Sequence, residues 1–249
     1  MLPRSGGDLP VTRRRDPGVT AMTYVLAVGE RIHSSWSLRG WLMFARFGIP
    51  VRVVTAPLYS PDFERVLADF APARLVPALR IEGEGLVVWD TLAIAETLAE
   101  RHPDRGLWPA DPTRRAVARS IVAEMHAGFG ALREACPMNL RRAYAGFVPS
   151  AEVLADLARI EALWSFAREA AGDGPWLFGD YSIADAFFAP VAARIAGYGL
   201  PVGSEAAGYV AAHLGEEAFR AWRAAGLAEQ RVLTNYDLDL PAAPWPGPG

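Results

Sequence analysis

The chain has 249 residues, enough for one large domain or two smaller ones, and 51% of them are apolar, so its composition supports a full hydrophobic core. The net charge of −3 gives no electrostatic reason to expect nucleic acid as a partner, and no apolar run is long enough to cross a membrane. The single cysteine, Cys136, excludes an internal disulfide framework and a Cys-x-x-Cys redox pair, which fits a cytoplasmic location.

The beginning of the chain differs in composition from the rest. Residues 1–22 hold prolines, glycines and three successive arginines, with no apolar periodicity. A signal peptide would need a continuous apolar stretch after its positive charges, and none follows here. We therefore expect a disordered leader in preference to a nucleic-acid-binding arm, with Met22 as a candidate for the natural start.

Short apolar runs alternate with helical patterns in the first half of the chain. In chain order we expect a strand at 24–28, a helix through 38–45, a strand at 51–54, a helix opening at Ser60-Pro61, strands at 78–81 and 86–89 joined by a turn at 83–85, and a helix from Asp90-Thr91 to 101. A parallel crossover followed by a hairpin predicts the βαβ-ββα order of a thioredoxin-like domain, at residues 23–102.

The pattern changes after a proline-containing linker at residues 103–113. Beyond it the apolar residues keep helical spacing, and no segment predicts a convincing strand. We expect helices at 113–134, 151–170, 183–199 and 216–229. The second half is therefore predicted to be an all-helical domain, residues 114–236, followed by a loose tail at 237–249.

The third of these helices begins with the pattern of a capping box, Ser182-Ile183-Ala184-Asp185. A serine and an acidic residue three positions later can each accept a hydrogen bond from the other's backbone N–H group. This pattern favours a role in folding over a role in function. Pro190 lies inside the same helix and predicts a kink there.

The junction between the first strand and the first helix carries the strongest functional signal, Ser34-Ser35-Trp36-Ser37-Leu38-Arg39. A serine at a helix start can cap the helix and still direct its hydroxyl to a ligand. The free N–H groups and the positive end of the helix dipole favour an anion there, including a thiolate. The residues alone leave open whether Ser34 binds a ligand or only caps the helix.

Five segments together resemble the cytosolic glutathione transferases, over residues 24–236. The Ser34 motif is similar to the Ser-Ser-Cys-Ser-x-Arg motif of the zeta class, with Trp36 in place of the cysteine. The others resemble the family's cis-proline loop, its Glu/Gln-Ser-x-Ala-Ile motif, its interdomain linker and its capping box: residues 74–79, 90–94, 107–116 and 182–185. The resemblance implies glutathione as co-substrate without a metal, a small electrophile as second substrate, and a homodimer.

By this resemblance Ser34 is the catalytic residue, with Ser35 as the second choice and Ser37 facing into the helix. A free thiol titrates at about 8.5, and one hydroxyl donated to a buried thiolate contributes about 1–2 kcal/mol, which lowers the thiol pKa by about one unit. The helix dipole adds to this effect. A cysteine-dependent redox enzyme of the family would carry a cysteine at position 34, so we expect no such chemistry, and Cys136 is expected to be a buried apolar residue.

The same resemblance places seven residues around glutathione: Ser35, Trp36, Arg39, Val76, Pro77, Asp90 and Thr91. If the Val76-Pro77 bond is cis, the Val76 backbone is free to pair with an extended peptide, as glutathione is. Thr91 would offer its hydroxyl to the γ-glutamyl carboxylate, and Asp90 would meet the ammonium group. Pro77 as a simple strand-start proline and Thr91 as an ordinary helix cap stay open as alternatives.

Charged residues near the motif have two interpretations each. Arg39 is unfavourably placed against the helix dipole, so we expect it to pair with the ligand or, equally, with a surface or interdomain carboxylate. His126 and Arg133 are candidates for binding an acidic second substrate, whereas Met125 and Phe129 on the same predicted helix face are expected in the core or an interface. His33 is expected to be an exposed loop histidine.

Three functions follow from the resemblance. The first is a glutathione S-transferase that adds the thiolate to a small electrophile. The second is a glutathione-dependent cis–trans isomerase of the maleylacetoacetate type, which the serine motif favours and the missing motif cysteine disfavours. The third is a non-catalytic binding or regulatory protein that has kept the fold.

Overall fold

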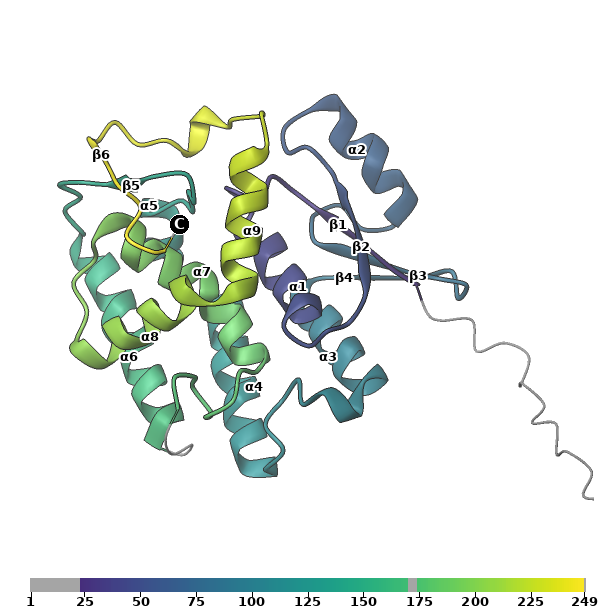
Figure 1. Cartoon of the computed structure of the whole chain (residues 1–249), viewed down its shortest axis with the longest axis horizontal. Coiled ribbons are helices and arrows are strands. Elements are labelled where there is room, and N and C mark those ends of the chain that lie inside the picture. Colours follow the sequence, from purple (N-terminus) through teal and green to yellow (C-terminus); the bar gives the residue numbers. More distant parts are fainter. Residues whose placement is uncertain (1–22, 170–173, 249) are drawn as a thin grey trace, which may run out of the picture.

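The computed structural model describes residues 23–169 and 174–248 (Figure 1). The leader expected at 1–22, and residue 170 of the helix expected at 151–170, lie outside this part. The first half contains β1 Thr23–Val28, α1 Ser35–Ala45, β2 Val51–Thr55, α2 Pro61–Leu67, β3 Ala78–Glu82, β4 Leu86–Trp89 and α3 Thr91–Arg101. The second half contains α4 Pro112–Ala127, α5 Gly130–Ala135, β5 Ala143–Tyr144, α6 Ala151–Glu169, α7 Ile183–Tyr198, α8 Ser204–Gly215, α9 Glu217–Ala228 and β6 Ala242–Ala243.

The first four strands form one mixed sheet in the order β2-β1-β3-β4. β1 pairs in parallel with β2, while β3 is antiparallel to both β1 and β4. Leu26, in the middle of β1, lies opposite Val53 on one side and Leu79 on the other. The parallel crossover followed by a hairpin confirms the thioredoxin-like order predicted from the sequence.

The side chains of β1 are apolar on both faces of the sheet, and helices cover both faces. Successive side chains of a strand point to opposite faces, so Leu26 packs in the large core with α1 and α3, whereas Val25 packs with Leu67 and Phe70 at the end of α2. Figure 1 shows α1 and α3 on the face of the sheet that is turned toward the helical half, with α2 on the opposite side. The loops at the ends of these elements therefore meet the helical half.

The helical half is organised around α7, which packs against α1, α4 and α8. The predicted capping box is confirmed at its start: the Ser182 N–H donates to Asp185 Oδ2 at 2.8 Å. The buried Asp185 carboxylate also accepts from the Tyr209 hydroxyl at 2.8 Å, so it joins α7 to α8. α7 continues through Pro190, and the kink expected there stays a prediction.

The helix expected at 113–134 is two helices, which corrects the sequence analysis. α4 ends at Ala127 and α5 begins at Gly130. Phe129 between them has a φ of 61°, in the left-handed region, and a Cβ on Gly128 would lie 2.8 Å from the Glu124 carbonyl oxygen. Because of this break, Met125 lies on α4 and Arg133 on α5. The two residues therefore do not share one helix face, although their spacing in the sequence predicts that they do.

Three further differences lie toward the end of the chain. α8 was missed because its small residues, Ser-Glu-Ala-Ala-Gly at its start, give little apolar periodicity. A short antiparallel pair, β5 with β6, corrects the expectation that this half has no strand. β6 lies in the tail expected to be loose (Figure 1). Trp245 beyond it packs against the core. None of the described helices is both long enough and apolar enough to cross a membrane.

Candidate functional site

All the site residues predicted from the sequence line one cavity, with the exception of Arg39. The cavity has a volume of about 1350 Å³. One wall comes from the ends of α1, β3 and α3 in the thioredoxin-like domain, and the other from α4, α5, α7 and the turn Thr234–Tyr236. Residues more than a hundred positions apart in the sequence therefore face the same space.

Ser34 is the N-cap of α1 and lines the cavity with a nearly buried side chain. Its Oγ accepts a long hydrogen bond of 3.4 Å from the Ser37 N–H and lies 2.7 Å from the Ser37 Oγ. The Ser37 hydroxyl is fully buried and accepts from the Gly29 N–H at 2.9 Å, so it bonds back to the end of β1. In the structure the Ser34 hydroxyl donates to the Ser37 Oγ, and rotation of the two hydroxyls, with Ser37 then donating to Ser34, would leave the Ser34 proton for a ligand in the cavity.

His33 is buried, with 3% of its surface exposed, which corrects the expectation of an exposed loop histidine. Its ring lies 4.8 Å from the ring of Tyr236, and its Nδ1 has no hydrogen-bond partner among the described residues. Burial lowers the pKa of His33 below its ordinary value of 6.5, opposed by a hydrogen bond to the Met138 backbone. The imidazole is therefore neutral near pH 7 and adds no positive charge beside Ser34.

The Val76-Pro77 peptide bond is cis, as the sequence analysis anticipated for this loop. Val76 lines the cavity just before β3 begins, and no hydrogen bond of its backbone is found in the described part of the structure. Gly40 of α1 packs on the Pro77 ring, since a Cβ at Gly40 would lie 2.9 Å from Pro77 Cγ. The glycine thus allows the helix and the loop to approach each other closely.

Asp90, and not Thr91, is the N-cap of α3, which answers the question left open for Thr91. Asp90 Oδ1 accepts from the Leu92 N–H at 2.8 Å, and Asp90 Oδ2 lies 3.2 Å from Nε2 of His126. Thr91 lines the cavity, yet its buried hydroxyl has no hydrogen-bond partner among the described residues. A buried hydroxyl without a partner is costly, and a ligand in the cavity would supply the missing bond.

Arg39 is buried in α1, with 1% of its surface exposed, and does not reach the cavity surface. Its Nε donates to the Phe187 carbonyl at 3.0 Å, and its guanidinium carbon lies 4.3 Å from the centre of the Trp36 ring. The expected carboxylate partner is not found in the described part of the chain. Trp36 separates Arg39 from any ligand, so direct contact with glutathione does not fit this arrangement.

His126 and Arg133 both line the cavity, on the side of the helical half. Arg194 of α7 joins them there, although the sequence analysis missed it. It is buried and donates to the Cys136 carbonyl at 2.8 Å and to the Pro190 carbonyl at 3.2 Å. A signal for Arg194 exists in the sequence, because it is the one charged residue in the apolar run 186–196 and a buried arginine is rarely without a role.

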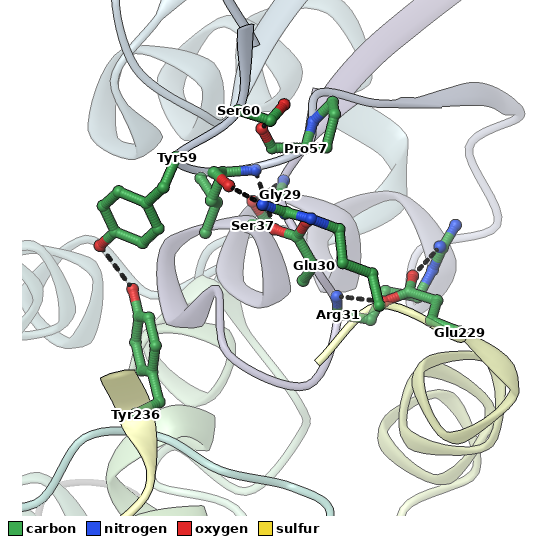
Figure 2. A network of polar contacts seen from close by, with 11 residues as sticks. Gly29, Glu30, Arg31, Ser37, Pro57, Tyr59, Ser60, Glu229 and Tyr236 are labelled. Atoms are coloured by element: carbon green, nitrogen blue, oxygen red, sulfur yellow. Dashed lines mark hydrogen bonds and ion pairs between the residues drawn. The ribbon is translucent and has the colours of Figure 1, made fainter. Parts of the chain in front are cut away.

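Two tyrosines missed in the sequence analysis meet at the mouth of the cavity. Figure 2 shows Tyr59, from the loop after β2, pointing toward Tyr236, and their hydroxyl oxygens lie 3.1 Å apart. Nearby, Arg31 and Glu229 form an ion pair at 2.5 Å that ties α9 to the loop after β1. No local pattern could reveal this contact, because Tyr236 follows the last helix and reaches the cavity only through the fold.

Cys136 lies behind the cavity and is fully buried. Burial raises the pKa of its thiol to about 12, so the thiol stays protonated near pH 7. The expectation that Cys136 is a buried apolar residue is confirmed.

Comparison with known proteins agrees with this geometry. Residues 33–101 match the family described as glutathione S-transferase, N-terminal domain. The chain is 33% identical over 118 residues to a probable maleylacetoacetate isomerase of Caenorhabditis elegans, covering 47% of this chain and 53% of that protein. It is 32% identical over 126 residues to the maleylacetoacetate isomerase of Pseudomonas aeruginosa, covering 48% and 56%. The matches thus span about half the length of these relatives.

Solved structures extend the likeness over most of the chain. A glutathione transferase homologue from Burkholderia gl BGR1 with bound glutathione is 25% identical, with a TM-score of 0.60, and the match covers 83% of this chain and 100% of that one. A maleylacetoacetate isomerase from Anaeromyxobacter dehalogenans with glutathione in its active site is 24% identical, with a TM-score of 0.56, over 88% and 99% of the two chains. Residues 33–101 therefore match the N-terminal domain of the glutathione S-transferases, and the described chain has the fold of the glutathione transferases.

Proposed function

We propose that this protein is a glutathione S-transferase in which the Ser34 hydroxyl holds the glutathione thiol as a thiolate. The observation that carries the proposal is the meeting of three groups in one cavity: the Ser34 hydroxyl, whose proton can turn from Ser37 to a ligand, and the Val76 backbone and buried Thr91 hydroxyl, which have no partner among the described residues. A peptide thiol can use all three, because it presents a sulfur, a backbone and a carboxylate. The bound glutathione in two solved relatives supports the same use of the fold.

The chemistry needs only groups that lie at the start of α1. The Ser34 hydroxyl donates to the sulfur, and the positive end of the α1 dipole favours the negative charge there. The thiolate then forms a carbon–sulfur bond with the electrophile, whose leaving group departs or whose carbanion takes a proton from water. No step in this scheme uses Cys136 or a metal.

A second candidate is glutathione-dependent cis–trans isomerisation of a maleylacetoacetate-type acid, the activity in the names of the relatives. The guanidiniums of Arg133 and Arg194 favour it, because both face the cavity and neither pairs with a carboxylate among the described residues. A non-catalytic binding protein is the third candidate. Steady turnover of maleylacetone would favour the isomerase over the general transferase.

Addition of millimolar glutathione is expected to raise the melting temperature of the protein. Any ligand that binds the folded state alone stabilises it by mass action, by about 1–3 kcal/mol when glutathione is at ten to a hundred times its Kd. The measurement is a thermal unfolding curve with and without glutathione, with S-methylglutathione as a ligand that lacks the thiol proton. The absence of a shift with both ligands would contradict the two enzymatic candidates and the glutathione site together.

Gly40→Ala is expected to weaken glutathione binding about tenfold, equivalent to about 1.4 kcal/mol. The new Cβ would lie 2.9 Å from the Pro77 ring, which moves only with its backbone, so the Val76 backbone would shift with it. Isothermal titration gives the Kd directly. Gly208→Ala is the matched control, since a Cβ there meets nothing within 4 Å in the middle of α8. Equal glutathione affinities of the Gly40 variant and the control would argue against the Val76 contact.

The proposal includes a homodimer and a cytoplasmic location, on the ground of the family resemblance. Glutathione and a small electrophile are its partners, and nothing in the acidic net charge of −3 suggests nucleic acid. The mass of the protein in solution at micromolar concentration tests the dimer.

A further inference from the structure

Trp36 is the largest departure from the family's motif, and the structure shows what its ring contacts. The guanidinium carbon of Arg39 lies 4.3 Å from the ring centre, and that of Arg133 lies 4.9 Å from it. The His126 ring meets the indole edge-on, with a distance of 5.0 Å between ring centres. One aromatic side chain thus joins cationic residues from α1 and α5 and a histidine from α4.

These guanidiniums are held in place by uncharged partners. Arg39, Arg133 and Arg194 donate to backbone carbonyls only, those of Phe187, Gly128, Cys136 and Pro190. Nη1 of Arg39 is buried without any acceptor among the described residues. Within residues 23–169 and 174–248, no carboxylate lies within 4.0 Å of any of the three.

Asp90, which acts on the charge of Arg39, is already engaged elsewhere. It caps α3 through its bond to the Leu92 N–H and lies 3.2 Å from Nε2 of His126. Burial is the main cause that lowers the pKa of Arg39 well below its ordinary value; Arg194 and Arg133 lower it further, and Asp90 opposes them. The cluster therefore keeps unneutralised positive charge next to the cavity, where Arg133 and Arg194 reach its surface.

We propose that Trp36 is a specificity-determining residue, whose ring positions the guanidinium of Arg133 without neutralising it and so selects electrophiles that carry a carboxylate. A carboxylate partner would hold Arg133 equally well but would cancel its charge. A cysteine, the residue of the family's motif, has no aromatic face and would leave the Arg133 guanidinium held only by its long hydrogen bond of 3.4 Å to the Gly128 carbonyl. The proposal rests on the proposed transferase function and adds a role for a residue of this chain.

The test compares two electrophiles that differ by one carboxylate group, and each variant is compared with the wild type on the same pair. Chlorodinitrobenzene and chlorodinitrobenzoate react with glutathione by the same displacement, in which a carbon–sulfur bond forms and chloride leaves. The measured quantity is the ratio of kcat/KM for the acid to kcat/KM for the neutral compound. We expect Trp36→Cys to lower this ratio about tenfold, mainly through KM for the acid, and Trp36→Phe to keep most of it.

Three further variants make the comparison specific. Arg133→Gln should lower the ratio as Trp36→Cys does, and the double variant should add little, because both changes remove the same interaction. Trp245→Cys is the matched control, since Trp245 also stacks with an arginine, Arg223 at 4.8 Å, but does not line the cavity. An unchanged ratio in Trp36→Cys, with a folded protein and a lowered ratio in Arg133→Gln, would overturn the proposal.

A binding measurement separates this proposal from the proposed function. S-Benzylglutathione and S-(carboxybenzyl)glutathione are compared by isothermal titration, so that no turnover is needed. We expect the wild-type protein to bind the acid more tightly and Trp36→Cys to lose that preference. Failure of both ligands to bind the wild type would contradict the glutathione site itself. Equal preference for the acid in the wild type and in folded Trp36→Cys would overturn the role of Trp36 alone.

Discussion

Ser34→Ala is expected to lower kcat/KM for glutathione conjugation about 5- to 30-fold, because the variant loses a hydrogen bond to the thiolate that contributes about 1–2 kcal/mol. The same loss raises the pKa of the bound thiol by about one unit, so the rate should reach its plateau about one pH unit higher than in the wild type. The readout is the pH profile of kcat/KM, together with the ultraviolet absorbance of the thiolate in the binary complex. Glutathione affinity should change little, since Val76 and Thr91 remain.

Two other serines, one distant from Ser34 and one in contact with it, provide the controls for this result. Ser120→Ala, on the exposed side of α4, should leave the profile unchanged. Ser37→Ala should give a smaller shift in the same direction, because its Oγ lies 2.7 Å from that of Ser34 and supports it from behind. The cap bond of Ser34 is long, at 3.4 Å, so a large loss of stability is not expected to obscure the kinetics. A Ser34→Ala profile identical to that of the wild type would argue that another group holds the thiolate.

The parts of the site that could be predicted are those set by local chain geometry. Ser34 and Asp90 stand at helix starts, and Pro77 stands at a strand start, so their positions follow from caps, turns and apolar periodicity. Each lies next to an element of the thioredoxin-like sheet. Their meeting in one site was implied by the family resemblance, with which the predicted βαβ-ββα order of elements agrees.

Beyond His126 and Arg133, the helical side of the cavity could not be predicted, because it depends on how the helical half packs. His33 looks exposed in the sequence and is buried by Tyr236, which follows α9. Arg39 is predicted to pair with the ligand or with a surface or interdomain carboxylate, and is instead covered by Trp36 and Phe187. The break at Phe129 sends Arg133 into the cavity from a separate helix. Such contacts join residues far apart in the chain, and no periodicity in either segment records them.

His213 accounts for a second large effect, on stability in acid. It lies on α8 with 1% of its surface exposed, and its ring centre lies 4.5 Å from that of Tyr209 and 5.2 Å from that of Trp176. Its Nε2 has no hydrogen-bond partner among the described residues. Burial, with a smaller effect of Arg168, lowers the pKa of His213 from its ordinary 6.5 to about 3. The folded protein therefore holds this imidazole neutral.

The sign of the pH dependence follows from the pH at which the imidazole of His213 is protonated in the unfolded and in the folded state. The unfolded chain protonates this histidine below about pH 6.5, whereas the folded protein does so only near pH 3. The stabilisation is therefore complete above pH 6.5 and is lost as the pH falls toward 3. Between pH 7 and pH 5 the wild type should lose about 2 kcal/mol of unfolding free energy more than His213→Phe, whose ring suits the same aromatic surroundings.

Urea unfolding followed by tryptophan fluorescence at the two pH values measures this difference. Burial raises the pKa of Asp185 in the same cluster, which acts with the opposite sign, but Asp185 is present in both proteins and cancels in the comparison. His102→Phe is the matched control: burial also lowers the pKa of His102, but that residue is only partly buried and should change the pH dependence much less. Parallel pH curves for the wild type and His213→Phe would mean that the folded protein admits a charged imidazole at this site, and the aromatic cluster between α7 and α8 would then have to open to water well above pH 5.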